Sequence, residues 1–350
     1  MELASKVIIT NSSPFEYAQY ASLILDKSNM AIGTVYRSTG SNYLVKRIDP
    51  SKGEDGDEFV DLVLTGRLRT SGSKSTNPVA VGDIVEFEME GEVAGGIINI
   101  KDRKNHIVRR SVNLSKRTQV IAANMDQAVL VVTIATPRTS AGFIDRFLVT
   151  SEAYSIPTII VFNKVDLYGE KEMVVLDEMR SIYELVGYRC LTISAEMGMG
   201  LEELIGLLKD KTTLISGHSG VGKSTLINAV QPGMELSTKE VSSFHSKGQH
   251  TTTFAEMFDL EIGGRIIDTP GIKGFGLVDM EPEMVADQFP EIYALKGQCK
   301  FNNCLHLNEP GCKVLDAVEQ GKIAESRFKN YLGFISGESE SPYRQDVYAE

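Results

Sequence analysis

Short apolar stretches separated by polar residues run from residue 31 to about residue 110, and their lengths predict strands. Turn residues punctuate them, as at Asp49-Pro50 and Gly82-Asp83. The predicted strands span residues 33–36, 43–48, 59–64, 84–89 and 96–100. About five short strands within some eighty residues are typical of a small barrel, and an oligonucleotide/oligosaccharide-binding (OB) barrel is the natural candidate.

From Gln127 onward the pattern changes to apolar strands that alternate with amphipathic helices. Apolar runs predict strands at residues 128–135, 158–162, 191–193 and 212–216, and a hairpin at 254–260 and 265–267 that turns at Gly263-Gly264. Apolar residues at helical spacing predict helices near residues 143–148 and at 171–186, 201–208 and 225–230. The apolar stripe of the second helix consists of Met173, Leu176, Met179, Tyr183 and Val186. This alternation predicts a doubly wound α/β domain with a largely parallel sheet.

The composition is ordinary for a soluble globular protein, with 42% hydrophobic and 24% charged residues among 350. No apolar run approaches the roughly 20 residues of a membrane helix, and the first 30 residues lack the apolar core of a signal peptide. We therefore expect a cytoplasmic protein without membrane contact. The net charge of -11 argues against a general attraction to nucleic acid, so any RNA contact needs a local basic patch.

Two groups of basic residues are candidates for such a patch. Arg67, Arg69 and Lys74 lie in or beside a predicted loop of the barrel. Farther along the chain are Lys101, Arg103, Lys104, Arg109, Arg110, Lys116 and Arg117, with Asp102 as the single acid among them. Each group would either meet RNA phosphates or be merely solvated, the second as a connector between domains.

Residues 217–224 read Gly-His-Ser-Gly-Val-Gly-Lys-Ser and match the phosphate-loop pattern between a predicted strand and a predicted helix. Glycines let the backbone wrap a phosphate, and the helix N-terminus adds free N–H groups and a positive dipole end. Lys223 would reach the β- and γ-phosphates, and Ser224 would hold Mg²⁺. A glycine-rich turn that matches by chance is the alternative. The residues expected to bind the nucleotide here are Gly217, His218, Ser219, Gly220, Val221, Gly222, Lys223, Ser224 and Thr225.

A second motif, Asn163-Lys164-Val165-Asp166, ends an apolar strand, where ligand-binding residues gather in sheets of this kind. The Asp166 carboxylate can accept hydrogen bonds from N1 and N2 of guanine, whereas adenine offers a different edge and matches it poorly. An ATP-driven enzyme is therefore disfavoured, and a helix N-cap at Asp166 is the structural alternative. Ser194 and Ala195, after the next strand, would pack beside the guanine.

Asp268-Thr269-Pro270-Gly271 ends the predicted hairpin. Asp268 would bind Mg²⁺ through water, and the Gly271 N–H would sense the γ-phosphate; a tight proline turn is the simpler interpretation. Residues 237–253 are polar and without strong periodicity, as expected of a switch loop that the γ-phosphate orders. A threonine hydroxyl there, assigned to Thr252, would complete the Mg²⁺ shell.

The order of these motifs differs from that of ordinary GTPases, because the base motif comes before the phosphate loop. A circular permutation explains this order, since it preserves the site while moving the termini to another loop. The segment that follows the turn at residues 268–271 is therefore connected directly to the part of the site that responds to the bound nucleotide.

That following segment carries Cys299, Cys304, His306 and Cys312. Three sulfur ligands and one nitrogen ligand match a closed structural Zn²⁺ site, and disulfides are a poor explanation in a reducing compartment. Cys190 is expected to be an ordinary core residue. Residues 314–332 then read as a helix.

The β-barrel, the permuted motifs and the Cys-x4-Cys-x-His-x5-Cys segment together resemble the ribosome small subunit-dependent GTPase A family of bacterial assembly factors. The resemblance covers about residues 31–335 and rests on residues 163–166, 217–224, 248–253 and 268–271 and on the four zinc ligands. We divide the chain into a tail (1–29), an OB barrel (30–110), a circularly permuted P-loop GTPase domain (111–280) and a zinc-binding helical segment with a tail (281–350).

The resemblance implies GTP hydrolysis to GDP that is slow alone and stimulated by the small ribosomal subunit, late in the maturation of that subunit. It also implies that the barrel and the zinc segment contact ribosomal RNA and that hydrolysis releases the protein, which we expect to be a monomer. A GTP-gated RNA-binding module, in which hydrolysis only times release, is the alternative function.

Catalysis would depend on Lys223, which stabilises charge, and on a residue that orients the attacking water. Directly after the Asp-x-x-Gly turn this chain has Ile272, whose side chain cannot orient water. His250 in the switch loop is the candidate, as its resemblance to the family's switch-loop histidine also indicates. Simple packing or RNA contact by His250 is the alternative.

Overall fold

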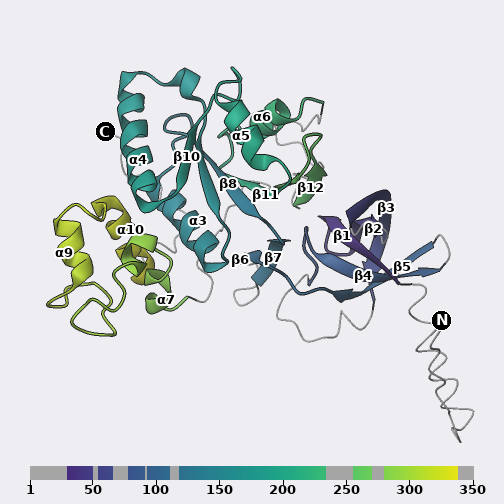
Figure 1. Cartoon of the computed structure of the whole chain (residues 1–350), viewed down its shortest axis with the longest axis horizontal. Helices are drawn as coiled ribbons and strands as arrows, with labels where there is room; N and C mark the ends of the chain where they lie inside the picture. The colour runs from purple at the N-terminus through teal and green to yellow at the C-terminus, as the bar shows by residue number, and fades with distance from the viewer. Residues whose placement is uncertain are drawn as a thin grey trace, which may run out of the picture.

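The computed structural model of the chain describes residues 30–49, 54–65, 78–90, 93–110, 118–233, 255–269 and 280–337. A small β-barrel, an open sheet with helices on both faces, and a group of short helices beside that sheet follow one another along the chain (Figure 1). The predicted tail at residues 1–29 and the basic residues Arg67, Arg69 and Lys74 lie outside the described residues.

Five strands form the barrel: β1 (Met30–Ser38), β2 (Asn42–Asp49), β3 (Glu54–Leu64), β4 (Ile84–Glu90) and β5 (Val93–Ile100). β1 pairs with β2 and β4, β2 pairs with β3, and β5 pairs antiparallel with β4 and parallel with β3, so the ring of strands closes. Alternate side chains point inward, among them the fully buried Val35, Tyr43 and Phe87. The predicted five-stranded barrel is confirmed, and its strands extend a few residues beyond the predicted ends.

A hairpin of β6 (His106–Arg110) and β7 (Thr118–Ala123) joins the barrel to the larger sheet. Gly82 of the barrel lies close to the end of β7, because a Cβ on Gly82 would be only 2.1 Å from the carbonyl oxygen of Ala123. The φ of Gly82, 88°, also favours glycine. The hairpin spans the division predicted between residues 110 and 111, and that division stays a prediction.

The basic segment before this hairpin is engaged by acids. Arg103 donates two hydrogen bonds of 2.7 Å to the fully buried carboxylate of Asp83, so Arg103 neutralises a buried charge. Two further ion pairs are Lys101–Glu86 and Lys104–Asp126. The interpretation of Arg103 as part of a free positive patch is therefore wrong. The side chains of Arg109, Arg110, Lys116 and Arg117 lie outside the described residues.

The larger sheet contains five parallel strands in the order β10-β9-β8-β11-β13. They are β8 (Gln127–Val132), β9 (Thr158–Phe162), β10 (Arg189–Thr192), β11 (Thr212–Ser216) and β13 (Arg265–Asp268), and β12 (Glu256–Asp259) is antiparallel to β13. β8 ends at Val132 rather than at residue 135 as predicted. The reason is a closed turn in which the Thr139 N–H donates to the Thr133 carbonyl oxygen at 2.9 Å.

Helices cover both faces of this sheet, as a doubly wound fold requires (Figure 1). α3 (Ala141–Ala153) and α4 (Glu170–Val186) pack on the face that includes Leu130 and Val132. α5 (Leu201–Leu208) and α6 (Lys223–Val230) pack on the face that includes Val129 and Val131. Met173 was predicted in the buried stripe of α4 but is exposed, because only the sector around Leu176 and Tyr183 faces the sheet.

The C-terminal segment consists of α7 (Pro282–Ala286), α8 (Pro290–Tyr293), α9 (Lys313–Glu319) and α10 (Glu325–Ile335). The single helix predicted at residues 314–332 is wrong, because Gly321 takes a left-handed φ of 68° and separates α9 from α10. Each helix contributes its own apolar residues to one core, which also contains Phe289. No helix in the described ranges is long and apolar enough to cross a membrane.

A buried ionic network fastens α10 to α3. Arg327, with a side chain 1% exposed, donates to the fully buried Asp145 of α3 at 2.7 Å and makes two hydrogen bonds to Glu291 of α8. Asn330 and Tyr183 also donate to Asp145. Burial raises the pKa of Asp145, and the charge of Arg327 opposes that rise. Burial also works to lower the pKa of Arg327, but Asp145 and Glu291 outweigh it, so the guanidinium stays charged.

Candidate functional site

The phosphate loop connects β11 to α6 at the carboxyl edge of the parallel sheet. Two of its glycines have no room for a side chain. A Cβ on Gly217 would lie 2.3 Å from the carbonyl oxygen of Val131, and a Cβ on Gly222 would lie 2.5 Å from Nδ2 of Asn163. Their φ values of 151° and 93° also favour glycine. These glycines therefore let the loop pack against two neighbouring strands.

The first residues of α6 carry the polar side chains of the phosphate loop. Lys223 Nζ donates to the carbonyl oxygens of Gly217 at 2.8 Å and His218 at 2.9 Å, so its ammonium lies over the loop. Ser224 and Thr225 follow in the first turn of the helix, whose leading N–H groups have no partner within the helix. An anion bound here would meet one positive side chain and the positive end of the helix dipole.

Asn163 braces the loop at residues 163–166, the predicted base-recognition loop, against the phosphate loop. It follows β9, is buried, and its Nδ2 donates to the carbonyl oxygen of Val221 at 2.9 Å. Its Oδ1 accepts a hydrogen bond of 3.0 Å from the N–H of Ala195. The structure thus brings together three segments that the sequence singled out separately.

Lys164 makes a second connection between these loops. Its backbone has a left-handed φ of 65°, and its Nζ donates to the carbonyl oxygens of Thr136 at 2.9 Å and Gly220 at 2.6 Å. The stem of the side chain therefore crosses from the base-recognition loop to the tip of the phosphate loop. Val165 begins the short turn of 3-10 helix that follows, Val165–Leu167.

Asp166 presents its carboxylate to solvent beside Ser194. The buried hydroxyl of Ser194 donates to Oδ1 of Asp166 and accepts a hydrogen bond of 3.1 Å from the N–H of Met197. The alternative of a helix N-cap at Asp166 is wrong, because Gly169 precedes α4. Asp166 is thus held in one orientation at the open side of the loop, which is what recognition of a base edge requires.

Two aromatic residues of this site were not predicted. The hydroxyl of Tyr168 donates to the carbonyl oxygen of Asn163 at 2.6 Å and accepts from the N–H of Ile134 at 2.8 Å. The ring of Phe143 in α3 stacks on His218, with centroids 3.6 Å apart. Burial and then the charge of Lys223 lower the pKa of His218, so its imidazole is neutral at pH 7. No local motif predicts the contacts of Tyr168 with Ile134 and of Phe143 with His218, because each joins residues from different elements.

The predicted Mg²⁺ residues only partly fall within the described chain. Asp268 ends β13 and lies opposite Ile215 in the neighbouring strand β11, directly before the phosphate loop. Its carboxylate and the hydroxyl of Ser224 are therefore at the same edge of the sheet. Thr252, Gly271 and His250 lie outside the described residues, and the roles assigned to them stay predictions.

The predicted zinc ligands come together in space. The ligand atoms of Cys299, Cys304, His306 and Cys312 all lie within 4.8 Å of one another. A Zn²⁺ ion with ligands at about 2.3 Å in a tetrahedron separates them by about 3.8 Å. The observed separations include 3.9 Å between the sulfurs of Cys299 and Cys312 and 3.3 Å between Nδ1 of His306 and the sulfur of Cys312. The donor set and its spacing therefore fit a metal ion.

Backbone groups around this cluster favour negative sulfur atoms. The N–H of Lys313 points to the sulfur of Cys299 at 3.4 Å, and the N–H of Leu315 points to that of Cys312 at 3.5 Å. Burial raises the pKa of Cys304 to about 12, so a free thiol there would keep its proton at neutral pH. A bound cation would reverse this preference, because metal coordination deprotonates a thiol.

A parallel sheet with a phosphate loop and with a base-recognition loop earlier in the chain defines the class of circularly permuted GTPases. The family model described as RsgA GTPase matches residues 100–278. The chain belongs to the RsgA GTPase family.

Relatives and solved structures match almost the whole chain. The small ribosomal subunit biogenesis GTPase RsgA of Flavobacterium psychrophilum is 52% identical over 322 residues, which are 90% of this chain and 95% of that protein. The protein of the same name in Christiangramia forsetii is 52% identical over 90% of this chain and 99% of its own length. The crystal structure of YjeQ from Thermotoga maritima has a TM-score of 0.70 and 35% identity, and covers 88% of this chain and 98% of its own. The structure of YloQ, a circularly permuted GTPase, has a TM-score of 0.66 and 30% identity over 90% of this chain and 97% of its own.

Proposed function

We propose that this protein hydrolyses GTP to GDP and acts in the biogenesis of the small ribosomal subunit, as the name of its relatives states for them. The observation that carries the proposal is the bracing of the base-recognition loop against the phosphate loop by Asn163 and Lys164. Guanine and its phosphates would be held by one connected unit, so binding of the base positions the reacting phosphate.

In this proposal the base lies against residues 163–166, Ser194 and Ala195, and the phosphates lie against residues 217–225. Ser224, Thr252 and Asp268 would hold Mg²⁺, which would neutralise charge on the phosphates. Lys223 stabilises the developing charge, the Gly271 N–H senses the γ-phosphate, and His250 orients the attacking water. The position of Asp268 opposite Ile215 supports the Mg²⁺ assignment.

We assign the metal of the C-terminal cluster as one structural Zn²⁺. Three thiolates and one imidazole nitrogen are typical Zn²⁺ ligands, and they fill all four positions of a tetrahedron. Tyr331 of α10 supports the loop by donating to the carbonyl oxygen of Leu305 at 2.8 Å. The ion would therefore hold the loop at residues 299–312 against α10.

Ribosomal RNA is the partner that we assign to the barrel and to the zinc segment. One exposed pair in the zinc segment supports this: Lys300 lies over the ring of Phe301. Aromatic faces next to cations suit stacked bases and their phosphates. We further propose that the protein is a cytoplasmic monomer with the four-part division given above.

The test is GTP turnover by the purified protein, alone and with small ribosomal subunits, with ATP and large subunits as controls. Small subunits, but not large subunits, are expected to raise GTP turnover by the protein about 10²–10⁴-fold, the range of a positioned general base. The variant His250→Ala is expected to lose this stimulation and to keep its affinity for GTP. Guanine binding without stimulation would contradict the ribosomal partner. A single hydrolysis event per bound subunit would favour the GTP-gated module over a multiple-turnover enzyme.

Replacement of Cys304 by serine is expected to remove the Zn²⁺ and to destabilise the C-terminal helices, because a structural site contributes its binding energy to folding. The purified wild-type protein is expected to contain one Zn²⁺ per chain by elemental analysis. Cys190→Ser is the matched control, since Cys190 is buried in the core of the sheet and outside the cluster. Equal metal content in the two variants would rule out the site.

A further inference from the structure

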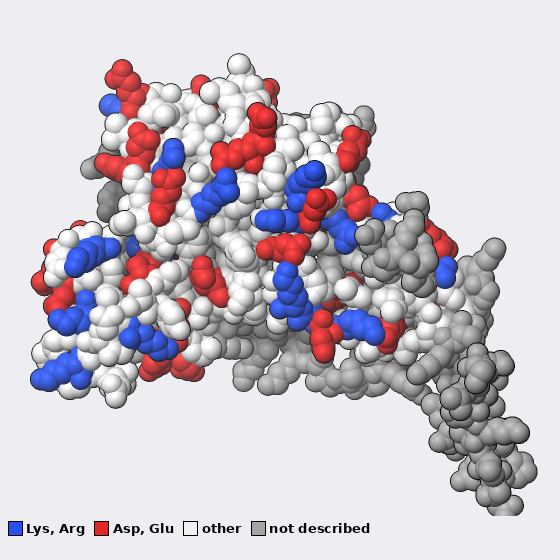
Figure 2. Space-filling view, in the orientation of Figure 1, with Lys and Arg blue, Asp and Glu red and all other residues white. Residues whose placement is uncertain are grey.

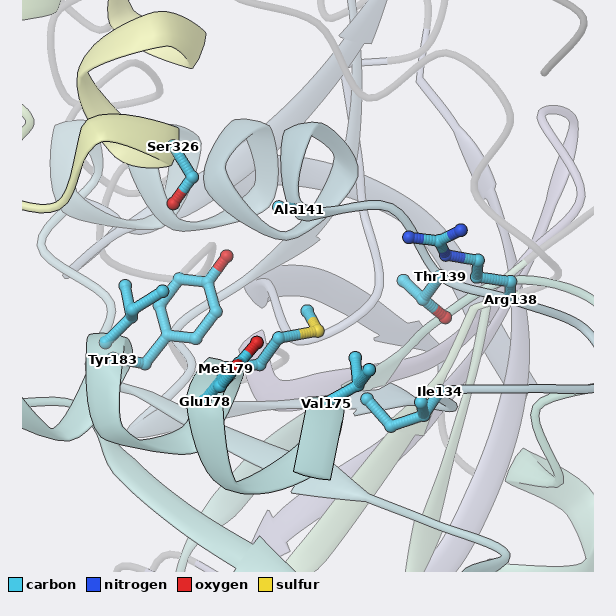
Figure 3. Close-up of a pocket in the computed structure, with 10 residues that line it drawn as sticks. Ile134, Arg138, Thr139, Ala141, Val175, Glu178, Met179, Tyr183 and Ser326 are labelled. Carbon is cyan, nitrogen blue, oxygen red and sulfur yellow. The ribbon is translucent and has the colours of Figure 1, made fainter. Parts of the chain in front are cut away.

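A cavity of about 200 Å³ lies where α4 meets the start of α3, the loop after β8 and the first turn of α10 (Figure 3). Its lining is mostly apolar and includes Ile134, Val175 and Met179. Figure 3 shows Val175 and Met179 rising from α4 toward the loop that carries Arg138. Sites for small ligands usually measure about 300–1,000 Å³, so this cavity fits one side chain better than a cofactor.

Two exposed apolar side chains lie on the outer face of α4 beside the cavity. Val174 is 58% exposed, and Leu185, at 71%, is the most exposed large apolar residue in the described part of the chain. Asp177, Glu178 and Ser181 lie between them on that face, and Ile182 is turned from it toward the cavity. The two side chains are eleven positions apart, or about 16 Å along the helix. This face of α4 therefore combines an apolar residue at each end with an acidic middle.

Acidic side chains predominate on α4, and Arg138 is the one base among the described residues that line the cavity. The acids of α4 are Glu170, Glu172, Asp177, Glu178 and Glu184, against Lys171 and Arg180. Arg180 is already paired with Glu184 at 2.7 Å, whereas Glu178, beside the cavity, has no ion-pair partner among the described residues. Figure 2 shows more acidic than basic side chains over α4. RNA phosphates would be repelled here, and lysine or arginine side chains of a protein would be attracted.

We propose that α4 from Val174 to Leu185, with the adjoining cavity, is a docking groove for a basic amphipathic helix of a partner protein. One apolar side chain of that helix fills the cavity, its neighbours cover Val174 and Leu185, and its basic residues meet Glu178 and Asp177. Anchors at helical spacing in a groove are a common mode of peptide recognition. The assignment of the partner to the small-subunit particle rests on the proposed function.

The first test is chemical. The photoreactive residue p-benzoylphenylalanine is placed at position 174 of the full-length protein, which is then irradiated with purified small ribosomal subunits and a non-hydrolysable GTP analogue. A covalent link to one protein of the particle is the expected result. A link to RNA, to a second copy of the chain or within the chain would overturn the proposal, as would the absence of any link.

The second test measures affinity. The double variant Val174→Ser, Leu185→Ser is expected to bind small subunits about ten- to a hundredfold more weakly, from the apolar area that it loses, with the melting temperature unchanged. Binding to ribosomal RNA stripped of protein is expected to stay the same. The control is Met173→Ser, since Met173 of α4 is 38% exposed, does not line the cavity and lies on another face of the helix than Val174 and Leu185.

Unchanged affinity of the double variant for subunits would overturn the docking groove, and so would equal weakening toward stripped RNA. Failure of the wild-type protein to bind subunits would instead contradict the proposed function, and with it the origin of the partner. The two failures are therefore distinguishable.

Discussion

Replacement of Arg327 by methionine is expected to lower the free energy of unfolding by about 3–5 kcal/mol, because it leaves a buried carboxylate without its cation. Asp145 is fully buried, and Arg327 approaches it at 2.7 Å. Methionine fills much of the volume of arginine, so the decrease in the free energy of unfolding would come from the missing charge rather than from a cavity. The measurement is urea denaturation, with hydrogen exchange in α3 and α10 to locate the loss.

The matched control is Lys329→Met in the same helix. Lys329 pairs with Glu325, but its side chain is 68% exposed, so a change within about 1 kcal/mol is expected. The double variant Arg327→Met, Asp145→Asn is expected to recover part of the loss, since the buried carboxylate is then removed as well. A loss for Arg327→Met no larger than that of the control would show that the network does not fasten α10 to α3.

Replacement of Asp166 by asparagine is expected to weaken GTP binding by about 3–6 kcal/mol, roughly a hundred- to ten-thousandfold, the value of two hydrogen bonds to a charged acceptor. The same variant is expected to gain affinity for xanthosine triphosphate. Xanthine carries an oxygen where guanine carries its amino group, so the asparagine amide can accept from N1–H and donate to that oxygen. The measurement is the dissociation constant of GTP and of xanthosine triphosphate for the wild-type protein and for the Asp166→Asn variant.

Asp177→Asn is the control for this variant, because Asp177 is an exposed acid of α4 outside the base-recognition loop. It is expected to leave both affinities unchanged. An Asp166→Asn protein that still preferred GTP would contradict the assignment of Asp166 to the base, while the phosphate loop would keep its own assignment.

Elements with a local signal were predicted well from the sequence. The strands predicted at residues 158–162 and 212–216 coincide with β9 and β11, because each is an apolar run that ends at a residue of a binding loop. The four ligands of the metal cluster were also recognisable, since coordination chemistry needs those residue types at short spacing. Helix ends were harder, as the break at Gly321 shows, because glycine is also tolerated inside a helical pattern.

Contacts between distant residues were not predictable in the same way. Asp145 and Arg327 are 182 positions apart, and Phe143 reaches His218 only because α3 packs beside the phosphate loop. The basic segment before β6 illustrates the limit most clearly. Its composition predicts a positive patch, yet Arg103 is paired with Asp83, a buried aspartate directly before β4.

By itself, the sequence determined the class of site: the order of the motifs, the base that they suit and a cysteine–histidine group that could hold a metal ion. These properties belong to residue types at short spacings, and no change in packing alters them. Only the tertiary structure decided which charges are neutralised inside the protein and which remain on its surface. The energy of a charge depends on its burial and on partners from other elements, and neither can be predicted from a local stretch of sequence.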